Sequence, residues 1–137
     1  MIKCLIADDS EPIRNRLKDL IFQTNGIELA GEAKDGYTAF SLIQDLKPEI
    51  IILDIRMKKL NGISVLDMMR KEVERQNTLK EKADFFKTNE AAPVIIIFSN
   101  YLNDRYIKRC RELGAGYYFS KTEGLEQIKS VFNEMLD

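Results

Sequence analysis

Short apolar, β-branched runs alternate with amphipathic stretches along the chain, and this alternation constrains the fold more than any other feature. The clearest run, residues 49–54, holds three isoleucines and a leucine in succession. An uninterrupted apolar strand is typical of the centre of a parallel sheet that helices cover on both faces. A similar run at 94–98 follows Pro93. The pattern therefore predicts strands that are buried from both sides.

The rest of the pattern completes an α/β fold. Strands are expected at 2–8, 27–33, 49–54, 94–98 and 116–120. Apolar residues at helical spacing, with Ser, Gly and Pro at the ends, predict helices at 11–24, from 36 to Pro48, from 62 to about 73, at 102–113 and at 125–136. The spacing predicts a doubly wound five-stranded parallel sheet, in the order 2-1-3-4-5, with helices on both faces. The alternating run 27–33 suits a sheet edge.

One segment, at about 74–92, does not fit this compact pattern. It is polar, and Leu79, Ala83 and Phe86 recur at helical spacing. We expect a partly helical insertion within a single domain that spans residues 1–137. Two interpretations stay open: a solvated surface excursion, or a partner-binding or dimer-forming helix, because Phe85 and Phe86 are costly to expose. The oligomeric state is open for the same reason.

Composition excludes several classes of protein. A length of 137 residues suits one domain, and no output domain is expected after the last helix. The net charge of −1 gives no electrostatic basis for nucleic-acid binding. No leader or apolar run of about 18 residues suggests a membrane segment. Cys4 and Cys110 lie in a predicted strand and helix, and we expect reduced thiols in a cytoplasmic protein.

Three carboxylates follow two of the predicted strands. Asp8 and Asp9 close the first strand, and Asp54 closes the third. Because the carboxyl ends of parallel strands meet at one edge, these acids should converge at the switch point of the sheet. Their mutual repulsion calls for a raised pKa or a bound cation. Mg²⁺, which prefers oxygen ligands, is the cofactor that we expect, in a site for phosphoryl chemistry.

Two further polar residues lie at the same edge of the predicted sheet, each at the end of another strand. Ser99 follows the fourth strand and Lys121 follows the fifth. Taken alone, they suit a helix cap and a solvated lysine. Beside three acids, a hydroxyl can donate to a phosphoryl oxygen and an ammonium can pair with its charge. Tyr118, three residues before Lys121, is either a partly buried edge aromatic or a mobile signalling residue.

The residues above and their separations resemble a response-regulator receiver domain of bacterial two-component signalling, from Ile2 to about Leu136. The family pattern D-x-x-M-P-x-x-x-G is met at Asp54, Met57 and Gly62. The resemblance implies a flavodoxin-like fold and a stand-alone switch, similar to a chemotaxis regulator. Such a switch takes its phosphoryl group from a sensor histidine kinase or a phosphotransfer protein.

The resemblance also implies a role for each site residue. Asp54 would be the phosphoacceptor. Asp9 would bind Mg²⁺ directly and Asp8 through water, together with Asp54 and the backbone carbonyl of Arg56. Ser99 and Lys121 would contact the phosphoryl group. Tyr118 would turn inward, so that the surface of the fourth helix, fifth strand and fifth helix controls an unknown protein target or a relay.

The sequence departs from the family pattern in three loops. Lys58 stands in the usual proline position, Thr122 follows Lys121 where many receivers have proline, and Asn100 follows Ser99 where alanine is commoner. Arg56 and Tyr101 lie two residues beyond Asp54 and Ser99. They are placed to influence attack by water, and hence the lifetime of the phosphorylated state.

Rival functions remain open at this stage. A Mg²⁺-dependent phosphohydrolase with an aspartyl nucleophile would usually carry a second acid at the position of Arg56, and the chain has no histidine to serve as a base. A receiver-like interaction domain that is never phosphorylated is a second alternative. An FMN site is disfavoured because the acids at 8–11 would repel phosphate. We therefore expect a signalling protein and not an enzyme.

Overall fold

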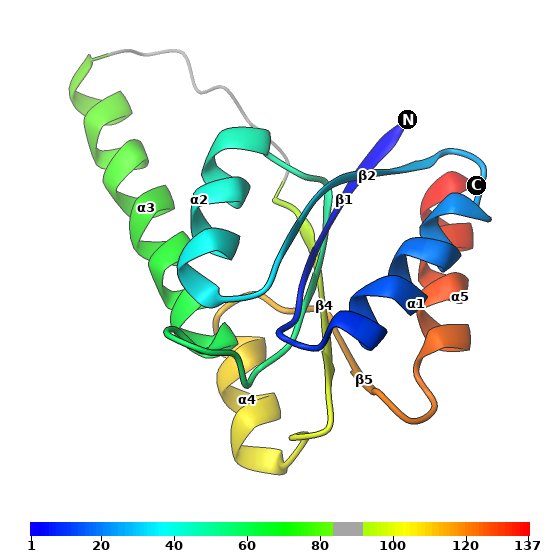
Figure 1. Ribbon diagram of the computed structural model, residues 1–137. Coiled ribbons are helices and arrows are strands. Elements are labelled where there is room, and N and C mark those ends of the chain that lie inside the picture. The colour runs from blue at the N-terminus through cyan, green and yellow to red at the C-terminus, as the bar shows by residue number, and fades with distance from the viewer. Residues whose placement is uncertain (84–91) are drawn as a thin grey trace.

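Five parallel strands alternate with five helices in the computed structural model, which describes residues 1–83 and 92–137 (Figure 1). The strands are β1 (Ile2–Ala7), β2 (Ile27–Ala33), β3 (Ile50–Leu53), β4 (Val94–Ser99) and β5 (Tyr117–Ser120). The helices are α1 (Glu11–Phe22), α2 (Gly36–Leu46), α3 (Gly62–Ala83), α4 (Asp104–Glu112) and α5 (Leu125–Leu136).

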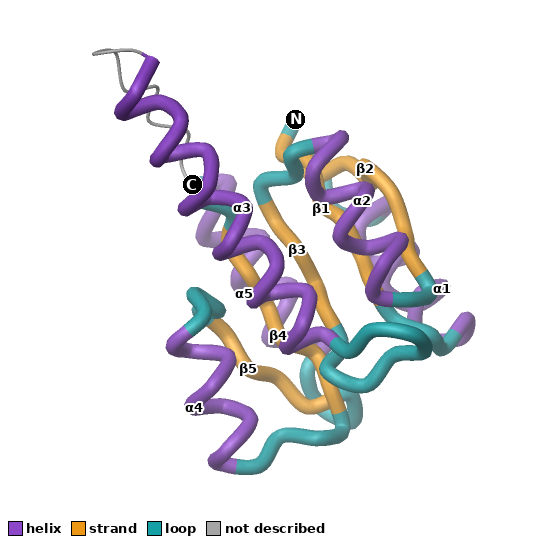
Figure 2. Tube along the Cα trace, turned by 90° about the vertical axis from the view of Figure 1, so that its left-hand side faces the viewer, coloured by secondary structure: helices purple, strands orange, loops and turns teal. Residues whose placement is uncertain are grey.

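The strand order is β2-β1-β3-β4-β5, and every pair is parallel, which confirms the predicted topology. β3 lies at the centre with all four residues buried, whereas β2 lies at an edge, as its alternating pattern indicates. The strands lie side by side in Figure 2, where loops gather beyond their lower ends. From β1 the chain first adds β2 on one side and then β3, β4 and β5 on the other. The boundary between β1 and β3 is therefore the switch point of the sheet.

Each face of the sheet has its own apolar core, because successive strand residues point to opposite sides. The helices α2, α3 and α4 cover one face, and α1 and α5 cover the other (Figure 1). The first core includes Leu5, Ile51, Leu53, Ile97, Ala39 and Leu66. The second includes Ile6, Ile52, Ile96, Leu17, Ile128 and Phe132.

The third helix is longer than the compact pattern requires. It continues to Ala83, so the first part of the segment 74–92 is helical. The upper half of α3 runs beyond the end of the sheet (Figure 1), which leaves Val73 56% and Leu79 52% exposed. Val73 therefore does not join the core. The predictions for Phe85 and Phe86 concern residues outside the described part of the chain.

Both cysteines are buried, unpaired thiols, Cys4 in β1 and Cys110 in α4. Burial raises the pKa of Cys4 to about 12 and that of Cys110 to about 11. A buried thiol of high pKa carries little reactive thiolate, so both cysteines are packing residues. Among the described helices, none combines the length and apolar character needed to cross a membrane.

Candidate functional site

Register between the central strands brings the acids to one level. Ala7 of β1 pairs with Leu53 of β3, so the residues that follow them, Asp8 and Asp54, are neighbours across the sheet. The Asp54 amide donates to the Ala7 carbonyl at 3.0 Å, and the Asp8 amide donates to the Ala33 carbonyl at 3.0 Å. The sheet hydrogen bonds thus continue one residue past the strands and position both acids.

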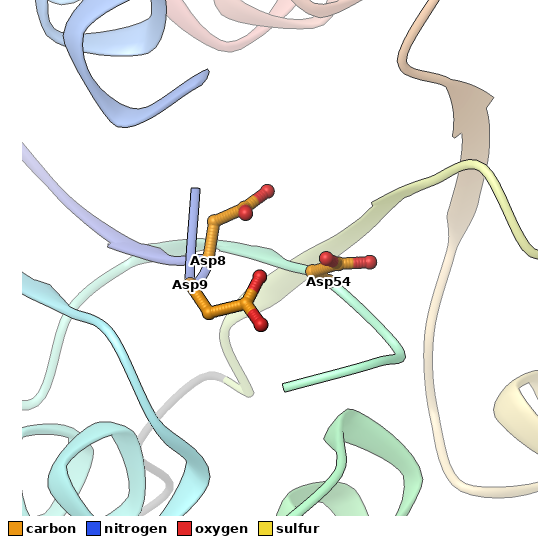
Figure 3. Close-up of side chains that lie close together, drawn as sticks. All are labelled: Asp8, Asp9 and Asp54. Atoms are coloured by element: carbon orange, nitrogen blue, oxygen red, sulfur yellow. The ribbon is translucent and has the colours of Figure 1, made fainter. Parts of the chain in front are cut away.

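The structure brings together the three acids that the sequence places at this edge. Asp8, Asp9 and Asp54 each offer a carboxylate oxygen, and the three oxygens lie within 4.8 Å of one another (Figure 3). Asp8 and Asp54 are buried, whereas Asp9 is exposed. The cluster therefore has a protected side and a side that faces solvent.

Lys121 reaches into this cluster from the end of β5. Its Nζ lies 2.8 Å from Oδ2 of Asp8 and 2.8 Å from Oδ2 of Asp54, and its side chain is only 11% exposed. Burial acts to lower the pKa of Lys121, but the hydrogen bonds to Asp54 and Asp8 outweigh it and raise the pKa. Burial also raises the pKa of Asp8, against the lowering effect of hydrogen bonds from Lys121 and from the amide of Ser10. One ammonium thus compensates two acids.

Asp54 keeps one oxygen open. Oδ1 is buried and has no hydrogen-bond partner in the described part of the chain, although Oδ2 is held by Lys121. A buried polar atom without a partner is costly, so such an atom calls for a ligand. Three carboxylates, one with an open oxygen and one facing solvent, form a donor set that fits a hard divalent cation. The residues present therefore fit the expected Mg²⁺.

Ser99 lies at the same edge, fully buried, and pairs in register with Ser120, the residue before Lys121. Its Oγ accepts a hydrogen bond from the Tyr101 amide at 3.1 Å. The Ser99 oxygen thus serves as an acceptor within its own loop, and no hydrogen bond joins its O–H to Asp8, Asp9 or Asp54. The following residue, Asn100, is exposed.

Arg56 and Tyr101 join the two loops that flank the cluster. The guanidinium carbon of Arg56 lies 4.0 Å from the centroid of the Tyr101 ring, which is the geometry of a cation–π contact. Both side chains are exposed, and Tyr101 is 42% accessible. The loop after β3 thus contacts the loop after β4 through two exposed side chains.

Tyr118 does not reach the cluster. It packs against the core under α4, and its hydroxyl donates to the Ala115 carbonyl at 2.7 Å. Burial raises its pKa, and the Arg111 guanidinium carbon lies 5.7 Å from the ring centroid. The ring is therefore held by the turn between α4 and β5.

Two loops that lack the family proline are held in other ways. After β5, the Lys121–Thr122 peptide bond is trans, and the Thr122 amide donates to Ser120 Oγ at 3.2 Å. After β3, Lys58 forms an isolated bridge with Asp35, and a Cβ at Gly62 would collide with the Asp54 carbonyl. Backbone pairing, a hydrogen bond to Ser120 and the close packing of Gly62 against the Asp54 carbonyl thus restrain these loops in place of the proline ring.

Sequence reasoning missed two residues that support the site. Asp35 caps α2 by accepting from the Thr38 amide at 2.8 Å, and its pKa is lowered chiefly by that bond. The sequence Asp35-Gly36 before a helix is a recognisable cap signal. Arg14 donates to the Asp8 carbonyl at 2.9 Å. Nothing in the sequence signals that bond, because it joins a side chain to a backbone atom.

Comparison with known proteins agrees with this geometry. The sequence pattern of the response regulator receiver domain family matches residues 4–80, more than half of the chain and including all three acids. A protein-glutamate methylesterase/protein-glutamine glutaminase of Methanospirillum hungatei is 31% identical over 137 residues, 98% of this chain and 35% of the relative. One of the same name from Pyrococcus horikoshii is 39% identical over 70 residues, 51% of this chain and 19% of the relative.

Solved structures of similar shape cover nearly the whole chain. The response regulator domain of Thermotoga maritima CheB has a TM-score of 0.73 at 26% identity, over 98% of this chain and 92% of its own. A Francisella response regulator receiver domain has a TM-score of 0.75 at 26% identity, over 97% and 94%. A LuxR-family response regulator from Staphylococcus aureus, at 21% identity and a TM-score of 0.78 over 100% of both chains, shows the same fold.

These relatives correct one expectation. The sequence led us to expect a protein that is not an enzyme, and the curated relatives contradict this because they are named as enzymes, methylesterases and glutaminases. The chain spans about a third of the length of the first of them. The expectation was wrong because it was drawn from the receiver residues, which do not determine the activity of a longer relative.

Proposed function

The chain belongs to the response regulator receiver domain family, and from this premise we propose that Asp54 accepts a phosphoryl group and thereby switches the protein. Receiver domains interact with histidine kinases or phosphotransfer proteins, and we propose that such a protein supplies the phosphoryl group from a phosphohistidine.

One observation carries the proposal: Oδ1 of Asp54 is buried within an acid cluster and has no hydrogen-bond partner among the described residues, while Oδ2 is held by Lys121. A nucleophilic oxygen must be free, and its carboxylate must be held in one orientation. Asp54 meets both conditions, whereas Oδ1 of Asp8 already accepts from the Ser10 amide at 2.9 Å. Asp9 is exposed and lacks a comparable restraint.

The transfer is a displacement at phosphorus. Oδ1 of Asp54 forms a bond to phosphorus as the phosphorus–nitrogen bond to the donor histidine breaks. The electron pair of that bond stays on the imidazole, which is protonated, and an acyl phosphate remains on Asp54. Lys121 stays within reach of the new phosphoryl oxygens and pairs with their charge.

We propose that Asp8, Asp9, Asp54 and the backbone carbonyl of Arg56 hold Mg²⁺. When bound, the ion neutralises charge on the phosphoryl oxygens. Asp9, as the exposed acid, offers a direct ligand, while Asp8 already shares one oxygen with Lys121 and the other with Ser10. A water-bridged contact suits Asp8 for that reason.

Switching follows from a change of hydrogen-bond partners. A phosphoryl group adds acceptor oxygens, and these favour a conformation in which the Ser99 O–H donates to them and the loop after β4 moves with Ser99. A full swing from 1:99 to 99:1 needs about 5.5 kcal/mol. The new charge-assisted contact from Ser99 supplies about 1.5–3 kcal/mol, and Lys121 adds to it as far as its contacts with the phosphoryl oxygens exceed those it already makes with Asp8 and Asp54. We propose that Tyr118 then leaves Ala115, so that the surface of α4, β5 and α5 changes.

This changed surface would control a protein target or a phosphorelay. Because the curated relatives are named protein-glutamate methylesterases, the first output to test is release of methyl groups from methyl-esterified protein glutamates. We propose that phosphorylation of Asp54 controls this activity, in a partner or in a longer form of the protein.

The test is intact-protein mass spectrometry after incubation with Mg²⁺ and acetyl phosphate. We expect one phosphoryl increment in the unmodified chain and in Asp45→Ala, which removes an exposed acid on α2. We expect none in Asp54→Ala. The increment should disappear on treatment with hydroxylamine, which cleaves acyl phosphates.

Absence of the increment with acetyl phosphate and with a panel of phosphorylated kinases would overturn the proposal. The protein would then be a receiver-like interaction domain. Turnover of unrelated phosphate esters would instead point to a phosphohydrolase, against which the position of Arg56 argues, since it places a cation where such an enzyme needs an acid.

A further inference from the structure

Arg14, in the first turns of α1, is bound to the backbone that carries the acid pair. Its Nη1 donates to the carbonyl oxygen of Asp8 at 2.9 Å, and its side chain is 13% exposed. Its Nε lies 3.8 Å from Oε2 of Glu32 on β2. The guanidinium therefore bridges the end of β1 to the edge strand, and nothing in the proposed chemistry uses it.

This hydrogen bond completes a three-point restraint on Asp8. The Asp8 amide donates to the Ala33 carbonyl at 3.0 Å, and Oδ1 accepts from the Ser10 amide at 2.9 Å. With its carbonyl held by Arg14, each polar group of Asp8 has a fixed partner. The Asp8 carbonyl belongs to the planar peptide unit that joins Asp8 to Asp9. Its orientation therefore helps to determine the direction in which the Asp9 side chain points.

Asp9 needs this restraint more than the other two acids. Asp8 and Asp54 are buried and bound by Lys121, whereas Asp9 is exposed and makes no hydrogen bond or ion pair within the described residues. Its carboxylate is nevertheless placed within 4.8 Å of the other two. The backbone before it is thus the element that directs it into the cluster.

We propose that Arg14 is a positioning residue for the Asp9 carboxylate in the Mg²⁺ site, an inference that rests on the function proposed above. It acts through the Asp8 carbonyl and not through its charge. The two effects have opposite signs: a nearby positive charge repels a cation, so its simple removal should tighten Mg²⁺ binding. Loss of a residue that orients a ligand should weaken binding, typically by about 10-fold or more.

The experiment compares Mg²⁺ affinity by isothermal titration calorimetry for the unmodified chain, Arg14→Met and Lys18→Met. Lys18 is the matched control, because it also pairs with Glu32, at 3.1 Å, but does not bind the Asp8 carbonyl. We expect Arg14→Met to lower the affinity by about 10-fold. Lys18→Met should stay within about twofold of the unmodified chain.

A stability measurement separates positioning from a merely structural role. The thermal midpoint is measured for each variant with and without Mg²⁺, and we expect the Mg²⁺-dependent increment to shrink in Arg14→Met alone. If Arg14→Met does not fold, Arg14→Lys replaces it, since it keeps the charge but loses the planar donor geometry, and it too should bind Mg²⁺ more weakly.

The outcomes distinguish the two proposals. If the unmodified chain binds Mg²⁺ and the Arg14 variants bind it as tightly or more tightly, the positioning role is wrong and the proposed function stands. Equal weakening in Lys18→Met would assign the effect to Glu32 and also overturn the role. If the unmodified chain does not bind Mg²⁺, the metal site and this inference both fail.

Discussion

Nζ of Lys121 lies 2.8 Å from Oδ2 of Asp54, while Oδ1 of the same carboxylate has no hydrogen-bond partner among the described residues. The two residues come from the ends of β3 and β5, on either side of β4. The contact therefore crosses β4, and its length depends on the spacing of β3, β4 and β5. Lys121 binds one oxygen of Asp54 and in doing so orients the other.

Removal of this ammonium should expose the repulsion between the acids. For Lys121→Met we expect the free energy of unfolding without Mg²⁺ to fall by about 1–3 kcal/mol, because two charge-assisted hydrogen bonds are lost while solvent partly reaches the acids. Urea denaturation measures the change, and Lys129→Met on the exposed side of α5 is the control. Added Mg²⁺ should restore part of the loss. Equal stability of the two variants would show that the contact contributes little.

Asp8 should make stability depend on pH. Because burial raises its pKa above 3.8 in the folded state, the folded protein binds that proton more tightly than the unfolded chain does. Ionisation of Asp8 therefore lowers the free energy of unfolding as pH rises from about 3.8 through the folded pKa. Asp8→Asn cannot ionise, so its stability relative to the unmodified chain should increase as pH rises from about 3.8 through the folded pKa of Asp8.

Denaturation curves at several pH values without Mg²⁺ check this prediction. Lys121 stays protonated throughout, since its pKa is raised from 10.5. Asp45→Asn, an exposed acid on α2, controls for the loss of one negative charge. A stability difference that is constant with pH, or that grows toward low pH, would contradict the predicted role of burial.

The contact between Arg56 and Tyr101 should affect how long the phosphoryl group survives. Tyr101→Ala removes the ring against which Arg56 lies, in the loop that follows Ser99, and we expect faster hydrolysis. An exposed cation–π contact contributes about 0.5–1 kcal/mol, and this corresponds to a change of about two- to fivefold in rate. The half-life of phosphorylated protein, followed by mass spectrometry, measures it. Tyr101→Phe keeps the ring and should decay at the original rate; faster decay there would implicate the hydroxyl instead.

The tight approach at Gly62 should not tolerate a side chain. A Cβ there would overlap the Asp54 carbonyl and lie 3.1 Å from Cα of Ile55. We expect Gly62→Ala to lower the free energy of unfolding by about 1–3 kcal/mol, even though alanine favours a helix. Gly116→Ala is the matched control, because no atom of the described part of the chain lies within 4 Å of its Cβ position. Chemical denaturation compares the two, and equal stabilities would show that the loop after β3 can shift freely.

Much of the architecture could be predicted because the pattern of the chain is consistent at several levels. The apolar run that forms β3 is continuous, so its central position follows from burial on both faces. The convergence of Asp8, Asp9 and Asp54 follows from parallel strands alone, since their carboxyl ends share an edge. These features depend on backbone topology and not on side-chain conformation.

Other features could not be predicted because they depend on which atom meets which. The bond from Arg14 to the Asp8 carbonyl joins a side chain to the backbone, and no residue type at position 8 would reveal it. The Ser99 Oγ accepts a hydrogen bond from the Tyr101 amide, a contact within its own loop that the position of Ser99 at the end of a strand does not reveal. The helix α3 continues to Ala83 because polar residues of good helix propensity extend it past the end of its apolar face.

The position of β5 has a consequence for local stability. This strand pairs with β4 alone, and none of its four residues is fully buried, whereas β3 pairs on both sides and is buried throughout. Segments with fewer buried contacts open at a lower free energy than the whole molecule, so amide protons of β5 should exchange with solvent sooner than those of β3. Lys121, which contacts Asp54, thus follows a strand that should open at a lower free energy than the centre of the sheet.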